Sequence, residues 1–268
     1  LTLTATASGI RDTDFSLLVT GGSNAWTVAN SVNSLLDTPD TNLGDGQALD
    51  IAGNRTLRAA VMESNASPGT DVIVLGAGTY TLTRSGRFED DSVFGDLDVK
   101  GKLTIRGVSA AATIIDAALL DRVFHVFPGA SLTLENLTIR RGEAFDGGGI
   151  FNEPGLPATP TIPAIPGGAV ILRHVNVIRN EAYNQGGGIF NAGSLTVVGS
   201  SISENLAGSR GGGVNNTGST SYLNTTISSN EAVSRGGGLF NENSATSTLT
   251  TVSLIANRSS SRGGGLAS

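Results

Sequence analysis

The chain has no cysteine, only two histidines and a single tryptophan, Trp26. The absence of cysteine excludes disulfide bonds and thiolate metal sites. Two histidines, His125 and His174, disfavour a metal centre built from imidazoles alone. Aromatic residues are 5% of the 268 residues, so the apolar content of 38% comes mainly from Val, Ile, Leu and Ala. Such side chains suit the narrow core of a repetitive solenoid better than a thick globular core.

Charge and hydropathy argue against two further classes of protein, those that bind nucleic acid and those that span a membrane with a helix. The net charge is −6, which argues against nucleic acid as a partner, because the phosphate backbone attracts basic proteins. No stretch approaches the roughly 18 consecutive apolar residues of a membrane-spanning helix. We therefore expect neither a nucleic-acid partner nor a membrane span.

Glycine is abundant, and part of it recurs in register along the chain. Gly-Gly-Gly triplets begin at Gly147, Gly186, Gly211, Gly236 and Gly263, at intervals of 39, 25, 25 and 27 residues. A nearly constant period of this length indicates a repeat architecture.

Other residue types keep the same phase as the triplets. Two asparagine columns are Asn180, Asn205, Asn230, Asn257 and Asn152, Asn191, Asn216, Asn241. Apolar columns are Leu134, Leu172, Val197, Tyr222, Leu249 and Val177, Ile202, Ile227, Leu254, followed by Ala182, Ala207, Ala232 and Ser259. Within each repeat, short apolar–polar alternation is the pattern of a half-buried strand.

These observations predict an all-β fold, a right-handed parallel β-helix with about 25 residues and about three strands per coil. Coils stacked about 4.8 Å apart place each residue type above its counterpart. We expect the asparagines to form structural ladders, because their amides can bond to one another and their backbone tolerates the left-handed region.

The front of the chain is less regular. Residues 55–66 predict a short helix that caps the stack, with Thr56 at its start. Residues 1–50 contain alternating segments that predict a β-rich lead-in or pairing arm, and residues 51–268 form the β-helix proper. A proline-rich insert occupies residues 153–168.

Part of this region resembles bacterial surface proteins of the CSLREA-domain type. The residues concerned are 56–61 (TLRAAV), 71–75 (DVIVL), 78–82 (GTYTL), 95–99 (GDLDV), 103–107 (LTIRG) and 121–126 (DRVFHV). The signature Cys-Ser-Leu-Arg-Glu-Ala is matched by Arg55–Ala60, without its Cys and Glu. The resemblance covers about residues 50–268. It implies a secreted or cell-surface β-helix, often within a larger protein, and brings no catalytic residues.

Two acidic clusters are candidate calcium sites, because Ca²⁺ prefers hard oxygen ligands. The first is Asp37, Asp40, Asn42, Asp45 and Asp50 on one turning loop, and the second is Glu89, Asp90, Asp91, Asp96 and Asp98. The alternative for the first is a solvated loop of Asx turns. Calcium is the only cofactor that the sequence suggests.

Two surface features point to partners. Arg210, Arg235 and Arg262 each precede a glycine triplet, and a row of guanidinium groups can bind an anionic glycan unless Glu204 and Glu231 neutralise it. The insert carries prolines at every third residue, Pro154, Pro157, Pro160, Pro163 and Pro166. This period predicts an extended polyproline arm that contacts a partner or lies on its own coils.

The function expected from these features is that of an extracellular structural or adhesive protein, not an enzyme. The alternative is a β-helix that binds or degrades polysaccharide, as lyases and glycosidases do. Such chemistry needs grouped carboxylates, and the sequence offers only a loose set: Asp116, Asp121, Arg122, His125 and Glu135.

The sequence also suggests self-association. Its last triplet falls in mid-coil, so we expect either further coils or another molecule on the last one. We expect residues 1–50 to pair with the open end of a neighbouring subunit, giving a head-to-tail fibre. The alternative partner is a neighbouring surface protein.

Overall fold

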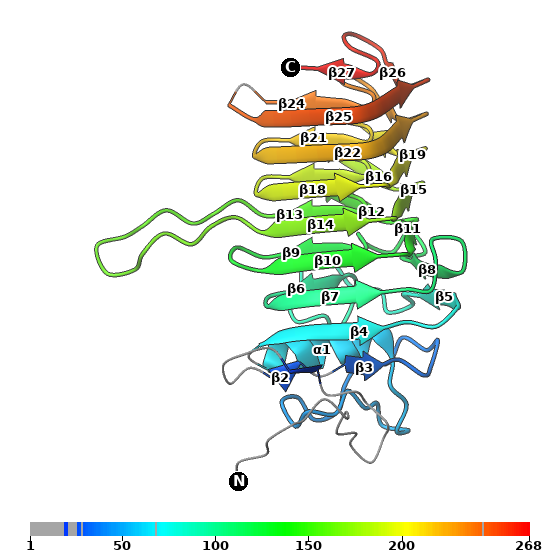
Figure 1. The fold of residues 1–268 in the computed structure, drawn as a ribbon, viewed down its shortest axis with the longest axis vertical. Helices are drawn as coiled ribbons and strands as arrows, with labels where there is room; N and C mark the ends of the chain where they lie inside the picture. The colour runs from blue at the N-terminus through cyan, green and yellow to red at the C-terminus, as the bar shows by residue number, and fades with distance from the viewer. Residues whose placement is uncertain (1–18, 21–25, 28, 68, 243) are drawn as a thin grey trace.

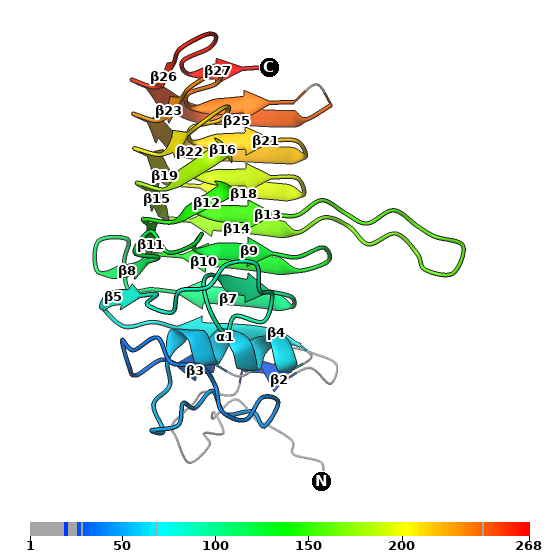
Figure 2. The same cartoon turned by 180° about the vertical axis from the view of Figure 1, so that it is seen from behind.

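The computed structural model describes residues 19–20, 26–27, 29–67, 69–242 and 244–268. The chain climbs as a stack of coils whose strands lie side by side in parallel (Figure 1). The near strands run to the right and the strands behind them return to the left, so the chain turns in a right-handed sense as it rises (Figures 1 and 2). The predicted parallel β-helix is confirmed.

Three sheets line the stack. The front sheet has 13 strands in two halves. Its first half holds β3 (Ala29–Ser31), β4 (Thr70–Val74), β7 (Lys102–Arg106), β10 (Ser131–Glu135), β14 (Ala169–Arg173) and β18 (Ser194–Val198). Its second half holds β5 (Gly78–Thr81), β8 (Thr113–Asp116), β11 (Thr138–Arg140), β15 (Asn176–Ile178) and β19 (Ser201–Ser203), and β22 (Ser219–Ser228) and β25 (Thr246–Ile255) run through both halves.

The other two sheets complete each coil. The corner sheet holds β12 (Glu143–Asp146), β16 (Glu181–Gln185), β20 (Leu206–Ala207), β23 (Glu231–Ala232) and β26 (Arg258–Ser259). The back sheet holds β6 (Leu97–Val99), β9 (Phe124–Val126), β13 (Ile150–Asn152), β17 (Ile189–Asn191), β21 (Val214–Asn216), β24 (Leu239–Asn241) and β27 (Leu266–Ala267). A regular coil such as β18 to β21 therefore contains four strands, one more than the pattern predicted.

The predicted columns are the registers of these sheets. Leu134, Leu172, Val197, Tyr222 and Leu249 are successive partners in the front sheet. The first four are fully buried, and Leu249 packs against the core with part of its surface exposed. Each coil therefore contributes one branched or aromatic side chain per column to a continuous core.

Two buried ladders of asparagine hold the coils in register. The side chain of Asn180 donates to Asn205, Asn205 to Asn230 and Asn230 to Asn257, at 3.0, 2.9 and 2.9 Å. The second ladder runs from Asn152 through Asn191 and Asn216 to Asn241, at 2.7, 2.8 and 3.0 Å. In the first ladder each amide oxygen also accepts a backbone N–H from the coil before it.

The left-handed backbone lies beside the first ladder, not in it. The residue before each asparagine of this ladder has φ between 53° and 56°: Arg179, Glu204, Ser229 and Ala256. The expectation that the asparagines themselves adopt the left-handed region is therefore wrong. Their amides, which satisfy buried backbone groups, explain the choice of residue.

The N-terminal helix α1 (Leu57–Ala66) closes the lower end of the core (Figure 1). Thr56 caps it, accepting the backbone N–H of Ala59 at 3.0 Å. Residues 57–64 of the helix are all buried, because the segment 32–50 packs on its outer side. Glu63, for example, accepts the backbone N–H groups of Gly44 and Gly46, each at 2.6 Å.

The pairing of residues 1–50 with a neighbouring subunit stays a prediction, and in this chain residues 29–50 lie within its own stack. Strand β3 joins the front sheet parallel to β4, and the residues after it complete the cap. Strands β1 (Val19–Thr20) and β2 (Trp26–Thr27) form a small antiparallel pair. The remaining part of the predicted arm, residues 1–18, 21–25 and 28, lies outside the described residues.

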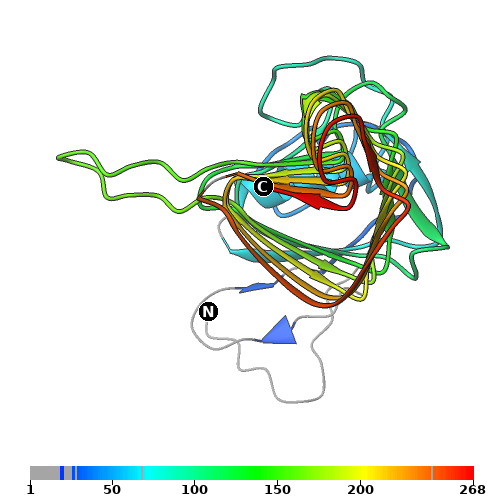
Figure 3. The ribbon, with the colours of Figure 1, turned by 90° about the horizontal axis from the view of Figure 1, so that it is seen from above.

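The proline insert is a hairpin and not a single polyproline arm. Leu156 and Ile165 exchange backbone hydrogen bonds of 2.8 and 2.9 Å, and Thr159 N–H donates to the carbonyl of Ile162 at 2.8 Å. The residues between the prolines keep their N–H groups, and those of Leu156, Thr159 and Ile165 pair across the hairpin. It projects far from the stack, as Figure 3 shows from above.

Candidate functional site

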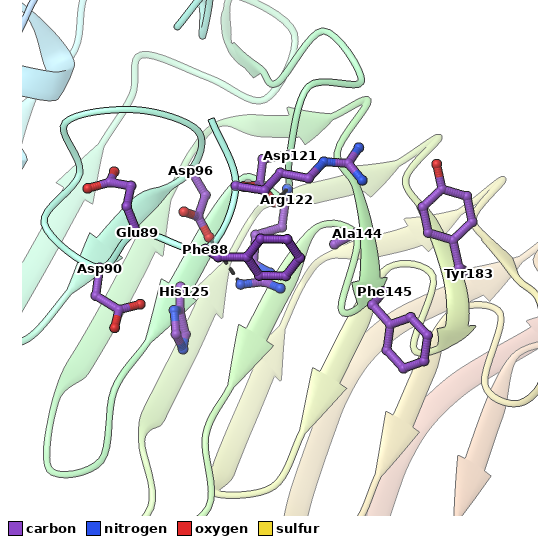
Figure 4. Close-up of a pocket in the computed structure, with 11 residues that line it drawn as sticks. Phe88, Glu89, Asp90, Asp96, Asp121, Arg122, His125, Ala144, Phe145 and Tyr183 are labelled. Carbon is purple, nitrogen blue, oxygen red and sulfur yellow. Dashed lines mark hydrogen bonds and ion pairs between the residues drawn. The ribbon is translucent and has the colours of Figure 1, made fainter. Parts of the chain in front are cut away.

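A cavity of about 440 Å³ lies beside the corner sheet in the lower part of the stack (Figure 4). The loop 83–96, between β5 and β6, forms one wall, β12 and β16 form the other, and residues in and before β9 form the floor. Its size is that of a small-molecule site. The lining residues are Arg87, Phe88, Glu89, Asp90, Asp96, Asp121, Arg122, His125, Ala144, Phe145 and Tyr183.

The loop wall is fixed by a buried arginine of the capping helix. The guanidinium of Arg58 donates to the carbonyls of Ser92, Gly95 and Asp96 at 2.8, 2.8 and 3.2 Å. The carboxylate of Asp98 accepts the backbone N–H of Ser92 at 2.7 Å. The cap therefore positions the residues that the loop presents to the cavity.

The floor collects ionisable groups of both signs. Asp96, Asp121 and His125 are 3, 5 and 7% exposed, and Arg122 Nη1 lies 3.3 Å from Asp96 Oδ2. Burial, with the carboxylate of Asp98 nearby, raises the pKa of Asp96 to about 8. Burial likewise raises the pKa of Asp121. The floor can therefore both donate and accept hydrogen bonds.

His125 lies between two carboxylates. Its Nε2 is 2.7 Å from Glu153 Oε1, and its Nδ1 is 3.4 Å from Asp98 Oδ1. Burial alone would lower the pKa of His125, but the nearby carboxylates of Asp98 and Glu153 outweigh it, so that the pKa is raised. The ring also packs against Phe127, with centroids 4.1 Å apart.

Aromatic rings form an exposed rim around this floor. Phe88, Phe145 and Tyr183 are 99, 63 and 53% exposed. Figure 4 shows Phe88 on the loop side of the cavity, and Phe145 and Tyr183 on the opposite wall. Glu143 accepts hydrogen bonds from Tyr183 Oη and Arg87, the latter at 2.9 Å, and these two donors lower the pKa of Glu143.

The part of the rim that the corner sheet supplies is confined to two coils. Phe145 and Tyr183 each follow a paired alanine, Ala144 and Ala182, in the corner sheet. In the next two coils the residues after the alanine are Gly208 and Val233. The aromatic pair therefore belongs to the cavity and is not part of the repeat.

The first predicted calcium cluster is not brought together around one point. Asp37 accepts from Arg58, Asp40 from Asn42 N–H, Asp45 from Asn42 Nδ2 and Gln47 N–H, and Asp50 from Thr38 and Asn54. These bonds are mostly those of the alternative, a loop of Asx turns. Within the described ranges, the one group of three acidic or histidine ligands that converges is Asp90, Asp98 and His125.

Some of the other predicted site residues meet at the cavity floor, and the rest form contacts elsewhere. Asp96 and Asp98 from the second acidic cluster meet Asp121, Arg122 and His125 from the enzyme set at the cavity floor. Glu89 hydrogen-bonds within its own loop, and Asp91 pairs with Lys100. Asp116 pairs with Arg140 and Arg141, and Glu135 pairs with Arg106 and Arg173. Neither acidic residue lines the cavity.

The arginine row is present as a stack. Arg210, Arg235 and Arg262 are joined by parallel bridges along one edge. Arg210 pairs with Glu242 at 2.7 Å and lies over the ring of Phe240. The expected neutralising residue Glu204 pairs instead with Arg179. An anionic ligand would have to displace Glu242 at the first of the three positions.

Sequence reasoning missed Arg58, Glu153 and the three rim aromatics. A usable signal existed for two of them, because Phe145 and Tyr183 occupy one outward position after the alanine column. Glu153 and Phe88 lie in an insert and an irregular loop, where no repeat phase exists.

No protein-family model matches the chain, and no curated protein or solved structure shows significant similarity to it. The resemblance to CSLREA-domain proteins therefore stays a prediction. Across the described residues, no helix is long and apolar enough to cross a membrane.

Proposed function

We propose that this protein is an extracellular adhesive β-helix that binds a neutral polysaccharide segment in the cavity. The observation that carries the proposal is the exposed aromatic rim, Phe88, Phe145 and Tyr183, around a floor of hydrogen-bonding side chains. The adhesive and extracellular part of the proposal rests on the resemblance of residues 50–268 to bacterial surface proteins.

The rim and the floor together match the chemistry of a sugar. A pyranose ring has apolar C–H faces, which stack on aromatic rings, and hydroxyl edges, which need donors and acceptors. Aromatic side chains this exposed contribute little to the core, so the area they offer is available to a ligand. The floor supplies carboxyl groups and the guanidinium of Arg122 for the hydroxyls.

The charge of the lining favours a neutral sugar over an acidic one. Three carboxylates, those of Glu89, Asp90 and Asp121, stand against the basic groups of the lining, Arg87, Arg122 and His125, while Asp96, with its pKa raised to about 8, is mostly protonated at neutral pH. This balance leaves no net positive charge to compensate the desolvation of a uronate or sulfate group, which costs binding energy.

The proposal is tested by binding. The purified protein is screened against neutral, amino-sugar and uronate oligosaccharides, and hits are titrated calorimetrically. We expect neutral oligosaccharides to bind, and Phe145→Ala and Tyr183→Ala each to weaken binding about 5- to 10-fold, the size of one aromatic contact. Val233→Ala is the matched control, because Val233 occupies the same position outside the cavity. Equal affinity of all three variants would refute the proposal.

Binding without turnover is part of the proposal. Prolonged incubation with each hit should release no reducing ends or unsaturated products. Turnover that disappears in Asp121→Asn would replace the adhesive role by the alternative, a polysaccharide-degrading enzyme.

A further inference from the structure

We propose that Asp90, Asp98 and His125 bind one divalent transition-metal cation, of the Zn²⁺ class, at the edge of the cavity. One ligand atom from each of the three residues lies within 4.8 Å of the other two. The inference does not rest on glycan binding, although Asp90 and His125 also line the cavity.

Asp98 supplies the observation that the protein's own contacts leave unexplained. Its side chain is 0% exposed. Its Oδ2 accepts the backbone N–H of Ser92 at 2.7 Å, whereas its Oδ1 is buried with no hydrogen-bond partner of proper geometry. A buried carboxylate oxygen without a partner is costly, and coordination of a cation compensates that cost.

His125 is oriented as a metal ligand would be. Its Nε2 is bound to Glu153 Oε1 at 2.7 Å, which leaves Nδ1 facing Asp98 Oδ1 at 3.4 Å. This separation is long for a hydrogen bond, but two ligands of a tetrahedral cation with bonds of 2.0–2.1 Å lie roughly 3.3 Å apart. A carboxylate behind the second ring nitrogen is the usual outer partner of such a histidine.

The third ligand closes the site toward the cavity. Asp90 is exposed on the loop 83–96 and also lines the cavity, so its carboxylate can reach the cation from the open side. Three protein ligands leave at least one coordination position for water or another molecule. One imidazole and two carboxylates suit Zn²⁺, Co²⁺ or Mn²⁺ better than Ca²⁺, which prefers six to eight oxygens.

The geometry therefore revises the sequence-based prediction for the second acidic cluster. Of Glu89, Asp90, Asp91, Asp96 and Asp98, only Asp90 and Asp98 converge, and their partner is a histidine from another coil. The histidine changes the preferred metal from calcium to a softer cation.

The test is calorimetric titration of the metal-free protein with ZnCl₂, with metal content measured after gel filtration. We expect one Zn²⁺ per chain. Asp98→Asn and His125→Gln should each weaken binding at least 10-fold. Glu153→Gln, which acts only through His125, should weaken it about 10-fold. His174→Asn is the matched control: it removes the other histidine, at a corner with φ 55° where Asn136 and Asn224 occupy the equivalent positions, and it should bind as the wild type does.

A second readout separates binding from misfolding. Zn²⁺ should raise the Tm of the wild type and of His174→Asn but not that of Asp98→Asn, because a ligand bound to the native state stabilises it. Co²⁺ should give visible absorption bands of tetrahedral intensity in the same two proteins. Absence of stoichiometric Zn²⁺ in folded wild type, or equal binding in Asp98→Asn, overturns the proposal. No glycan is present in any of these measurements, so they leave the proposed function to its own test.

Discussion

Arg58 of the capping helix and Asp37 of the segment before it form a buried ion pair, with Nε and Oδ1 2.7 Å apart and side chains 0 and 3% exposed. Asp37 Oδ2 also accepts the backbone N–H groups of Thr83 and Arg84, at 2.6 and 3.1 Å. The pair therefore joins the cap to the start of the loop that forms one wall of the cavity.

The first prediction concerns this pair. Arg58→Met should destabilise the protein by about 3–5 kcal/mol, because it leaves the carboxylate of Asp37 buried without its counter-ion. Urea unfolding followed by circular dichroism measures the change. Arg106→Met is the control: Arg106 pairs with Glu135 at 2.7 Å but is half exposed, and its loss should cost less than about 1 kcal/mol. Similar losses of stability for both variants would show that the buried pair Arg58–Asp37 contributes no more than an exposed ion pair.

The second prediction compares two members of one asparagine ladder. Asn205→Ala removes the amide that accepts from Asn180 and donates to Asn230 and to the carbonyl of Val177. Each buried group left unpaired costs about 1–3 kcal/mol, so we expect a loss of at least about 3 kcal/mol. Asn257→Ala, at a partly exposed ladder position, should cost about half as much, because water can reach the groups it leaves. A larger cost at Asn257 in thermal unfolding would show that the ladder bonds do not determine stability.

The third prediction uses the glycine triplets. A Cβ at Gly213 would lie 2.5 Å from the carbonyl oxygen of Gly238, so Gly213→Ala forces two coils apart. We expect a loss of about 1–3 kcal/mol or more, typical of overpacking. At the equivalent Gly265 the nearest atoms are those of Leu254, at 3.5 Å or more, and Gly265→Ala should change stability by less than about 0.5 kcal/mol. Equal denaturation midpoints for the two variants would rule out close coil contact as the reason for the triplet.

The fourth prediction concerns Tyr222, which occupies a core column otherwise filled by aliphatic residues. Its ring is fully buried and its hydroxyl has no hydrogen-bond partner, since Thr220 on the same strand pairs with Ser247 at 2.6 Å instead. Tyr222→Phe should therefore be neutral or stabilise the protein by about 1 kcal/mol, because it removes an unpaired buried hydroxyl. Calorimetric melting checks the sign. A loss above 1 kcal/mol would mean that the hydroxyl is satisfied in solution.

The stacked region was predictable because one periodic signal fixes its register. Once the glycine triplets set the phase, Leu172 and Val197 had to be neighbours, as did Asn205 and Asn230, and the structure pairs them. The number of strands per coil was less accessible, because β20 and β23 are only two residues long and carry little alternation.

The cavity was not predictable by the same reasoning. Its parts come from coils with irregular corners, so sequence spacing does not reveal that Asp98 and His125 are neighbours in the back sheet. The buried arginine was unexpected for a different reason. A charged residue on a short helix normally faces water, and only the three-dimensional arrangement of Asp37 and the loop carbonyls makes its burial acceptable.

The hairpin at residues 153–168 enters and leaves the stack without disturbing it. Just before the insertion Asn152 pairs with Asn191, and just after it Ala169 pairs with Ser194, as in the regular coils. The equivalent corners at Gly193 and Gly218 connect the same two sheets through a few residues. The register is thus maintained by the ladders and triplets, while this corner is free to vary in length. Peptide epitopes or small folded modules grafted at Gly193 or Gly218 should therefore be displayed in a row on one side of the molecule, at a spacing set by the rise of the coils.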